Sequence, residues 1–505
     1  MSRQCIHCGS TKVNADGKRT TVAGVIKQKY SCKNCGKNYS VDTGNNKFSS
    51  TEKINDQIIV ITAAQNNTEV NQEFVDSLLF YCKKRKATLK IIPIKYGAPE
   101  EGTELSWNVP NDLLLTGSVQ ASEKLRVLAN FNILPSIDNP LSGIDHLSKG
   151  DSLIVGHTQL QCRTLAVNAV DTPAILTTTG VITKPNYTQT KQGEKARFNH
   201  SYSALVIEKT KNEFHIRVLN ADDTGGFFDI SGYYTANSFK PLNGIEALIT
   251  GDEHALFVSP EVRAATYDNK DSMVNILKPK LIVRHDVLDC YSVSHHHKNS
   301  FFTRYGKFHA GTHKIEDELE ITLDFIKKTT PKFAKNLIVS SNHNDHLYRW
   351  LNEAEPKFEP WNAKIYHQLM YLMLDKMSLL DNGFTYENPF ELWVRSKKNT
   401  EMIQFIGRDD SYKICDIEIS NHGDAGTNGS RGSLLQYSRL AYKQVIGHSH
   451  SPGIKSGAYQ VGTSSNLRLE YVKGPSSWLH THCAIYPNGK RQLINILGGN
   501  WNGGL

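Results

Sequence analysis

Five short segments rich in metal-binding side chains constrain the fold of this chain more than any other feature. They lie between residues 251 and 450, and each combines Asp, His or Asn within a few positions. In order, they are Gly251-Asp252-Glu253-His254, His285-Asp286-Val287-Leu288-Asp289, Ser341-Asn342-His343-Asn344-Asp345, Asn421-His422-Gly423-Asp424 and Gly447-His448-Ser449-His450. Side chains so far apart in sequence can share one site only if the fold returns the chain repeatedly to the same place.

A short apolar run precedes most of these segments. The runs are Ala247-Leu248-Ile249, Leu281-Ile282-Val283, Leu337-Ile338-Val339 and Val445-Ile446. An apolar run of this kind, ending in polar residues, is typical of a buried strand. Because an open α/β sheet presents its site at the carboxyl ends of its strands, the pattern predicts an α/β fold with one site at those ends.

Seven of the polar side chains are candidate ligands for two divalent cations. On an extended segment, residues two apart point to the same face, so Asp252 and His254 can bind one ion, and His448 and His450 repeat the spacing. Asp286 can bridge two ions because a carboxylate has two oxygens. The full set is Asp252, His254, Asp286, Asn342, His422, His448 and His450. Two cations roughly 3.5–4 Å apart stabilise both the attacking and the leaving oxygen of an in-line phosphoryl displacement.

The order of the segments resembles that of the calcineurin-like metallophosphoesterases, whose motifs are D-x-H, G-D-x-x-D, G-N-H-D/E, a lone H and G-H-x-H. The first and last motifs match in full. His285 replaces the glycine of the second, while Ser341 and Asn344 replace the glycine and the acidic residue of the third. The resemblance covers about residues 244–500, and these replacements affect loop geometry more than metal ligation.

The resemblance also implies a role for each site residue. The first ion would take Asp252, His254, Asp286 and His450, and the second Asp286, Asn342, His422 and His448. His343 would face the substrate phosphate as a catalytic residue, with Asp289 orienting its ring. The ions would be Mn²⁺ or Fe²⁺, with Zn²⁺ as the alternative, because all three suit imidazole and oxygen ligands.

The N-terminal 45 residues contain two cysteine knuckles, Cys5-Ile6-His7-Cys8-Gly9 and Cys32-Lys33-Asn34-Cys35-Gly36. Four cysteines in this arrangement predict a zinc ribbon, in which Cys5, Cys8, Cys32 and Cys35 bind one structural Zn²⁺. The surrounding lysines leave two roles open: contact with nucleic acid, or docking of another protein.

A β-α-β unit follows, with strands at residues 58–61 and 89–94 around a helix at 70–81. Residues 184–200 are predicted to form a basic, aromatic loop that either lines a substrate groove or is simply solvated. The expected architecture is α/β: a calcineurin-like metallophosphoesterase sandwich preceded by an α/β domain and an N-terminal zinc ribbon. The predicted boundaries are 1–45 for the ribbon, 52–240 for the α/β domain and 244–500 for the catalytic domain.

Four further segments of the catalytic domain have their own predictions. Residues 316–326 and 366–380 are expected to be helices, the second in the core. His295-His296-His297 is expected in a loop, since adjacent side chains of a strand point to opposite faces and three do not easily share one ion. The glycine-rich residues 424–432, with Arg431, either bind a phosphate or form a flexible turn. Residues 497–501 are expected to be a tail.

Composition limits the class of protein. Of 505 residues, 39% are hydrophobic and 21% charged, which is ordinary for a soluble globular protein. No apolar run is long enough to span a bilayer and no signal peptide is evident, so a cytoplasmic location without a membrane partner is predicted. The net charge of +8 favours a polyanionic partner such as DNA. The sequence leaves open whether the chain forms a homo-oligomer.

The layout of the whole chain resembles the pre-early proteins of large tailed coliphages that degrade host DNA and take part in DNA transfer. The segments that carry this second resemblance include Ala64-Gln65-Asn66-Asn67 and Thr177-Thr178-Thr179-Gly180. It implies a DNA nuclease that acts in the cytoplasm of an infected bacterium. Two alternatives remain: a small-molecule phosphatase or phosphodiesterase with the same metals, and a non-catalytic nucleic-acid-binding protein.

Overall fold

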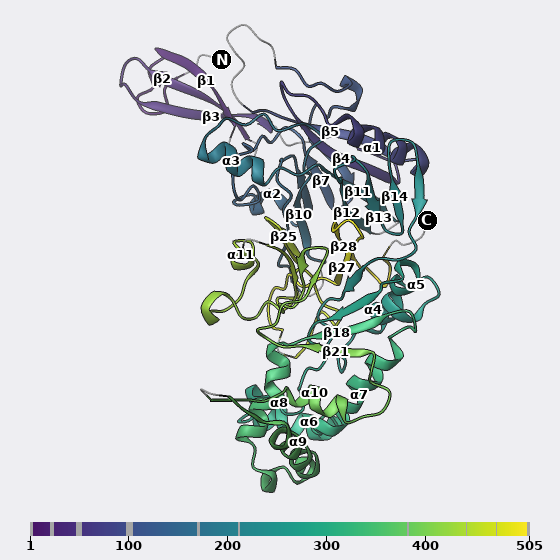
Figure 1. Cartoon of the computed structure of the whole chain (residues 1–505). Helices are drawn as coiled ribbons and strands as arrows, with labels where there is room; N and C mark the ends of the chain where they lie inside the picture. The colour runs from purple at the N-terminus through teal and green to yellow at the C-terminus, as the bar shows by residue number, and fades with distance from the viewer. Residues whose placement is uncertain are drawn as a thin grey trace. The chain divides into compact units, whose positions relative to one another are not determined.

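The computed structural model describes residues 4–20, 25–46, 53–96, 105–168, 172–210, 213–380, 383–440, 442–470 and 472–501. The chain divides into two compact units (Figure 1). Unit 1 comprises residues 1–165 and 174–214, and unit 2 comprises residues 166–173 and 215–505. The three domain boundaries drawn from the sequence remain predictions.

Unit 1 begins with a three-stranded antiparallel sheet in the order β1-β2-β3. The strands are β1 (Val13–Thr20), β2 (Val25–Cys32) and β3 (Asn38–Asn46). The segment before β1 and the turn between β2 and β3 carry the two cysteine knuckles. Both knuckles therefore lie next to the same small sheet.

The predicted β-α-β unit is present. Strand β4 (Ile58–Gln65) pairs in parallel with β5 (Thr88–Ile94), and α1 (Gln72–Arg85) connects them. The side chain of Asn71 accepts a hydrogen bond from the backbone N–H of Phe74 and so caps the helix. Strand β11 (Ser203–Lys209) pairs antiparallel with the other edge of β4.

A third set of paired strands in unit 1 has the order β9-β10-β8-β7-β6. Its strands are Cys162–Leu165, Ala174–Thr178, Ser152–Val155, Leu125–Leu128 and Val119–Ser122, in that order, and the short helix α2 is Asp145–Ser148. The prediction of a loop over residues 184–200 is wrong in part, because α3 (Lys191–Phe198) forms there. Thr190 starts this helix by accepting from the N–H of Gly193. Two basic side chains of the segment are also paired, Lys184 with Glu69 and Lys195 with Asp138.

The main sheet of unit 2 has six strands in the order β21-β18-β17-β16-β27-β28. Its first four strands are parallel to one another, and β27 runs antiparallel to β16. In sheet order they are Ile403–Ile406, Lys335–Val339, Leu281–Arg284, Ala247–Ile249, Thr481–Ile485 and Arg491–Asn495. The apolar runs at residues 247, 281 and 337 are strands, as the sequence predicts, and the structure shows that they are adjacent and parallel.

A second group of strands in unit 2 has the order β22-β23-β24-β26-β25. These are Lys413–Ile414, Ile417–Glu418, Lys443–Ile446, Ala458–Gln460 and Gly453–Lys455. Strand β12 is Phe214–Asn220. Three short strands form an antiparallel set: β13 (Phe227–Asp229), β14 (Gly232–Tyr234) and β15 (Phe239–Pro241). An antiparallel pair consists of β19 (Ser378–Leu380) and β20 (Gly383–Thr385). Strands β23 and β24 are parallel and carry two of the five motifs at their carboxyl ends.

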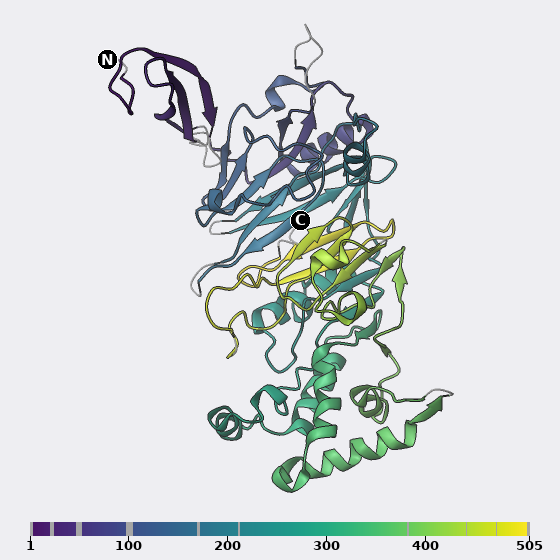
Figure 2. The same cartoon turned by 90° about the vertical axis from the view of Figure 1, so that its left-hand side faces the viewer.

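The helices of residues 301–395 gather beside β21, the edge strand of the main sheet (Figures 1 and 2). The α-helices of unit 2 are α4 (Pro260–Arg263), α5 (Met273–Leu277), α6 (Phe301–Ala310), α7 (Ile315–Lys328), α8 (Asn342–Glu353), α9 (Ala363–Lys376), α10 (Pro389–Arg395) and α11 (Leu434–Tyr437). Helix α7 confirms the prediction for residues 316–326. Helix α9 ends at Lys376 rather than residue 380, and it exposes Tyr371 and Leu374 instead of lying wholly in the core.

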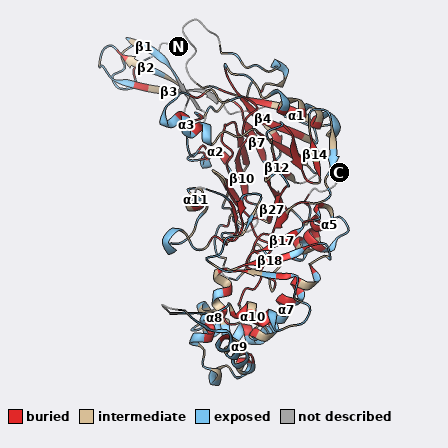
Figure 3. Cartoon of the chain, viewed as in Figure 1, coloured by how far each residue is buried: buried red, intermediate tan, exposed pale blue. Residues whose placement is uncertain are grey.

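The core of unit 2 lies around the main sheet. Strands β17 and β18 are almost entirely buried, whereas α8 and α9 carry exposed residues (Figure 3). The expectation of a tail at residues 497–501 is wrong, because Trp501 is buried in this core. Its indole N–H donates to the backbone oxygen of Asp271, at 3.2 Å, so the apolar ring and its polar atom both find partners.

Candidate metal centres

The four cysteines of the N-terminal knuckles form one cluster, which we call the four-cysteine group, with their sulfur atoms all within 4.8 Å of one another. The Sγ atoms of Cys5 and Cys35 are 3.7 Å apart, and those of Cys8 and Cys32 are also 3.7 Å apart. A tetrahedral zinc site with Zn–S bonds of about 2.3 Å has sulfur–sulfur edges of about 3.8 Å. The group therefore has the size that a structural Zn²⁺ requires.

Local backbone geometry brings the four sulfurs together. Gly9 and Gly36 end the two knuckles with φ of 69° and 70°, a left-handed conformation that glycine adopts without strain. Their N–H groups donate to the carbonyls of Cys5 and Cys32, closing each turn. The backbone N–H of Cys35 also lowers the pKa of the Cys32 thiol to about 6, which favours the thiolate that binds metal.

The Asp and His segments converge in unit 2 at the carboxyl ends of its strands. Asp252 lies three residues beyond the end of β16, and Asp286 two residues beyond the end of β17. Asn342 is the first residue of α8, three beyond the end of β18. The other sheet contributes His422 after β23, and His448 and His450 after β24. Parallel strands place their carboxyl ends along one edge, which explains why these segments meet.

The first group at this centre contains Asp252, His254, Asp286 and His450, all buried, with ligand atoms within 4.8 Å of one another. The Nε2 atom of His450 lies 3.1 Å from Oδ2 of Asp252 and 3.2 Å from Nε2 of His254. These are the four residues that the metallophosphoesterase resemblance assigns to the first ion.

The second group contains Asp252, His285 and His422. Nε2 of His422 lies 3.0 Å from Oδ2 of Asp286, so this group adjoins the first, and Nδ1 of His422 lies 3.3 Å from Nδ1 of His285. His448 belongs to none of the groups found among the described residues, although its ring centroid is 5.3 Å from that of His422.

Sequence reasoning missed His285 as a candidate ligand. It occupies the position of a turn glycine in the motif, so the motif pattern assigns no role to its side chain. The signal that points to it is an imidazole directly after a fully buried strand, beside Asp286. Burial also lowers the pKa of His285 to about 4, so the ring is neutral and able to bind a cation at neutral pH.

Several buried polar atoms of the centre have no hydrogen-bond partner among the described residues. They are Oδ1 of Asp252, Oδ1 of Asp286, Oδ1 of Asn342, Nε2 of His285 and Nδ1 of His450. A buried polar atom without a partner costs about 1–3 kcal/mol, more if it is charged. Burial by itself raises the pKa of a carboxyl, but His422 and His343 outweigh it and hold the pKa of Asp286 well below its usual range. An anionic, unpaired set of oxygen and nitrogen atoms fits divalent cations.

The backbone at this centre is left-handed at four non-glycine positions. The φ angles are 44° at His254, 44° at Asp286, 74° at His448 and 59° at His450. Asp252 forms a β-bridge with Thr463, and His254 two positions later is left-handed, yet the two side chains meet in one group as the spacing predicts. Such conformations cost about 1–3 kcal/mol each and cluster at functional sites.

A buried ion pair involves Glu253, a residue of the first motif. Arg284, at the end of β17, lies 2.8 Å from Glu253, and both side chains are fully buried. Tyr267 donates a hydrogen bond to the same carboxylate. Gly447 gives the centre the room it needs, because a Cβ there would collide with Oδ1 of Asp252 and with the ring of His285. Neither role is visible in the motif pattern.

Asp289 lies between two imidazoles of the centre. Its Oδ1 is 3.0 Å from Nδ1 of His343, and its Oδ2 is 3.6 Å from Nδ1 of His254. The other nitrogen of His343, Nε2, is 4.0 Å from Oδ2 of Asp286, and the side chain keeps 19% of its surface exposed. Burial lowers the pKa of His343, but Asp286 and Asp289 outweigh that effect and raise it to about 10.

The histidine triplet forms a 3₁₀ turn, His295–His297, rather than an extended loop. As a result, His295 and His296 come together with His346 of α8, and the ligand atoms of the three lie within 4.8 Å of one another. The rings of His346 and His343 are 5.0 Å apart. His297 stays outside this group, in keeping with the expectation that three adjacent histidines do not easily share one ion.

Arg408, which sequence reasoning also missed, is the cation beside the glycine-rich loop. It lies 2.6 Å from Asp345 and 2.7 Å from Asp424, and so links α8 to the segment that follows His422. Arg431, the predicted phosphate-binding cation, is exposed and follows a 3₁₀ turn at Thr427–Gly429. No sequence motif marks Arg408, which follows β21, because only the fold brings it close to Asp345 and Asp424.

Searches against family models and against solved structures found no match. Among curated proteins, the chain is 31% identical over 460 residues to Protein A1 of Escherichia phage T5. The alignment covers 88% of this chain and 82% of that protein. The chain belongs to the Protein A1 family. Membership supports a bacteriophage protein, in agreement with the coliphage resemblance of the whole layout. In the described part of the chain, no helix combines the length and apolar character that crossing a membrane requires.

Proposed function

We propose that unit 2 is a two-metal phosphodiesterase of the calcineurin-like metallophosphoesterase type, and that it hydrolyses DNA. The observation that carries this proposal is the pair of adjoining Asp and His groups, buried at the carboxyl ends of parallel strands. Oxygen and nitrogen atoms without other partners favour cation binding over a purely structural role.

In this mechanism the chain holds two divalent cations and positions one imidazole beside them. Asp252, His254, Asp286 and His450 would hold the first cation, and His285, His422 and Asn342 would hold the second together with Asp252 and Asp286. When bound, a cation pair supplies a nucleophile from water at neutral pH and stabilises the charge that develops on phosphorus oxygens.

His343 is the proposed catalytic side chain. The backbone oxygen of Asp289, at 2.9 Å, and its carboxylate, at 3.0 Å, both fix Nδ1, so that Nε2 is directed toward the centre while the ring stays partly exposed. From this position Nε2 can donate a proton to the departing oxygen or stabilise charge on the phosphate. A positioned acid of this kind contributes about 10²–10⁴ in rate.

We propose Mn²⁺ or Fe²⁺ as the active ions and Zn²⁺ as the ion of the four-cysteine group. The buried centre offers carboxylate, imidazole and amide ligands and no thiolate, whereas the N-terminal group offers four sulfurs. Soft thiolate ligands select zinc, while carboxylate and imidazole accept Mn²⁺ and Fe²⁺ as well as Zn²⁺.

DNA is the proposed substrate because the family is viral, the chain is cationic and the centre suits phosphodiesters. With a net charge of +8, the protein attracts a polyanion. Degradation of host DNA in the bacterial cytoplasm is the proposed biological role.

The test compares substrates under defined metals. Purified protein with Mn²⁺, Fe²⁺ or Zn²⁺, or with chelator, is incubated with plasmid DNA, single-stranded DNA and a chromogenic phosphomonoester. We expect Mn²⁺-dependent or Fe²⁺-dependent cleavage of DNA. Turnover of the small ester with every DNA form uncut would replace the nuclease by a phosphatase. Inactivity toward all substrates despite bound metal would favour a non-catalytic nucleic-acid-binding protein.

A further inference from the structure

Helix α6 exposes a row of aromatic rings that the proposed chemistry does not use. Phe301, Tyr305 and Phe308 are 73%, 62% and 59% exposed, and their spacing of four and three residues places them on one helical face. The rings of Phe301 and Tyr305 are nearly parallel, at 13°, with centroids 6.3 Å apart. Aromatic rings this exposed leave a large apolar area in contact with water.

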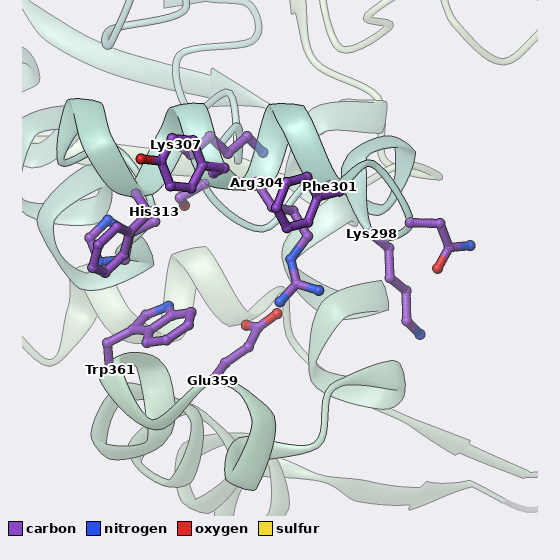
Figure 4. A pocket seen from close by; sticks show the side chains of 11 residues that line it. Lys298, Phe301, Arg304, Lys307, His313, Glu359 and Trp361 are labelled. Atoms are coloured by element: carbon purple, nitrogen blue, oxygen red, sulfur yellow. The ribbon is translucent and has the colours of Figure 1, made fainter.

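These rings border a cavity of about 570 Å³. Trp361 and His313 lie on one side of it, with ring centroids 5.4 Å apart, and Phe301 and Arg304 lie across from them (Figure 4). We call this cavity the α6 groove and define it by Lys298, Phe301, Arg304, Tyr305, Phe308 and Trp361.

The α6 groove is cationic as well as aromatic. Lys298, Arg304 and Lys307 line it, against one acidic side chain, Glu359. Lys307 anchors the helix, because its ammonium donates to the backbone oxygen of Tyr291 and lies 4.2 Å from the centre of that ring. In Figure 4 the guanidinium of Arg304 reaches into the cavity on the side of Glu359. Lys298 lies 3.5 Å from Glu353, so a phosphate would compete with these carboxylates for the two cations.

Two further cavities lie between the α6 groove and the candidate metal centre and share lining residues with their neighbours. A small cavity shares Lys298, Arg304 and Lys307 with the groove and is also lined by His295. His295 in turn lines a cavity of about 830 Å³ together with Asn342, whose side chain belongs to the metal centre. The three sets of lining residues therefore adjoin one another and form a path of side chains from Trp361 to Asn342.

More aromatic and basic side chains border the end of this path next to the metal centre. Tyr348 and Tyr386 stack with centroids 4.4 Å apart and line the larger cavity with Arg349 and Arg408. Both arginines also pair with carboxylates, Arg349 with Glu353 and Arg408 with Asp345 and Asp424. Proteins bind single-stranded nucleic acid through this combination of groups: bases stack on the rings, and the cations contact the phosphates. A small phosphate ester would use neither the length of the path nor its rings.

We propose that the α6 groove binds an unpaired strand of nucleic acid and leads it into the metal centre. Bases stack on Phe301, Tyr305 and Trp361, while Lys298 and Arg304 contact the phosphates. The inference rests on the proposed phosphodiesterase function, because the strand that the groove holds is the substrate of that centre.

The test measures binding without cleavage. Fluorescence anisotropy follows a labelled oligo-dT on the Asp286→Ala chain in chelator. The added double substitution Phe301→Ala with Tyr305→Ala is expected to weaken binding about tenfold or more, as base–aromatic stacking predicts. The matched control is Phe302→Ala, which is 84% exposed on the same helix and lies outside the groove. It should leave the affinity unchanged.

A second measurement examines the charge. Arg304→Gln should weaken binding and reduce the slope of log affinity against log salt by about one, because one phosphate contact is lost. The proposal is overturned if three variants bind the oligonucleotide with equal affinity: the double variant, Arg304→Gln and the Phe302→Ala control. So would a changed oligomeric state in sedimentation with unchanged affinity, which would identify the face as a contact with a second copy.

Failure of the groove and failure of the enzyme give different results. In the otherwise wild-type chain, Phe301→Ala with Tyr305→Ala should retain hydrolysis of bis-p-nitrophenyl phosphate and lose cleavage of single-stranded DNA. If the wild-type chain hydrolyses neither substrate but still binds oligo-dT through the α6 groove, the phosphodiesterase proposal fails and the binding site stands. Loss of both activities in the double variant, with metal content unchanged, would count against the groove.

Discussion

The four-cysteine group and the Asp–His centre are both able to bind metal, but they are built in opposite ways. The four cysteines come from two turns beside one small antiparallel sheet, within 31 positions of the chain from Cys5 to Cys35. The Asp–His centre collects side chains from Asp252 to His450, at the ends of strands from two sheets. One site is local, and the other depends on the whole of unit 2.

The backbone shows the same contrast. In the cysteine knuckles, glycines adopt the left-handed conformations, so the turns form without strain. At the Asp–His centre, His254, Asp286 and His450 adopt them, at about 1–3 kcal/mol each, and the surrounding core must hold them in place. We infer that the first site serves folding, while the second is organised for chemistry, and that each can be removed without the other.

Asp286→Ala should have the largest effect. It removes the carboxylate that lies within reach of both groups, so the centre should lose its cations and hydrolysis should fall by about 10⁴ or more, since metal pairs supply the nucleophile and the charge stabilisation. Phosphodiester hydrolysis and metal content by mass spectrometry measure the two effects. One zinc per chain should remain in the four-cysteine group. Loss of all metal from this variant would show that the two sites are not independent.

His343→Ala should reduce turnover by about 10²–10⁴, because it removes a positioned acid without removing a ligand. The metal content of the Asp–His centre should stay at the wild-type value. Steady-state kinetics with DNA and metal analysis of the same sample provide the comparison. A variant that loses a cation would instead make His343 a ligand, in line with its place beside His254 and Asp289.

Asp289→Ala should have a smaller effect, about 10–100-fold, on activity and on metal affinity together, as is usual for groups that orient ligands. The carboxylate contacts both His343 and His254, so its loss should loosen one catalytic ring and one ligand. Metal titration by calorimetry separates this result from that of His343→Ala. A loss of activity with unchanged metal affinity would mean that Asp289 acts on His343 alone.

Cys32→Ser combined with Cys35→Ser should have the smallest effect on catalysis. The chain should lose one zinc and the order of the β1–β3 sheet, because a structural zinc site contributes directly to folding. Hydrolysis of a small phosphodiester by unit 2 should remain unchanged. Cys415→Ser, at an exposed cysteine in unit 2, is the matched control and should keep the zinc. An unchanged zinc count in the double variant would refute zinc binding by the four-cysteine group.

The sequence by itself determined the features that depend on neighbouring residues. Apolar runs predicted strands β16, β17 and β18, the spacing of charged and apolar residues predicted α7, and the C-x-x-C-G knuckles predicted the four-cysteine group. Hydrophobic periodicity and tight-turn chemistry act over a few residues, and a single chain segment records them. The ordered motifs also identified the four side chains that meet in the first Asp–His group.

Only the tertiary structure decided which other side chains join them. His285 faces His422, 137 positions later, and Arg408 reaches Asp345 and Asp424 because β21 ends beside α8. Trp501 packs into the core, and His295 and His296 meet His346, although no local pattern distinguishes these residues from solvated ones. Contacts between distant segments depend on how complete sheets and helices pack, and the left-handed backbone of His254 and Asp286 persists only because that packing holds it.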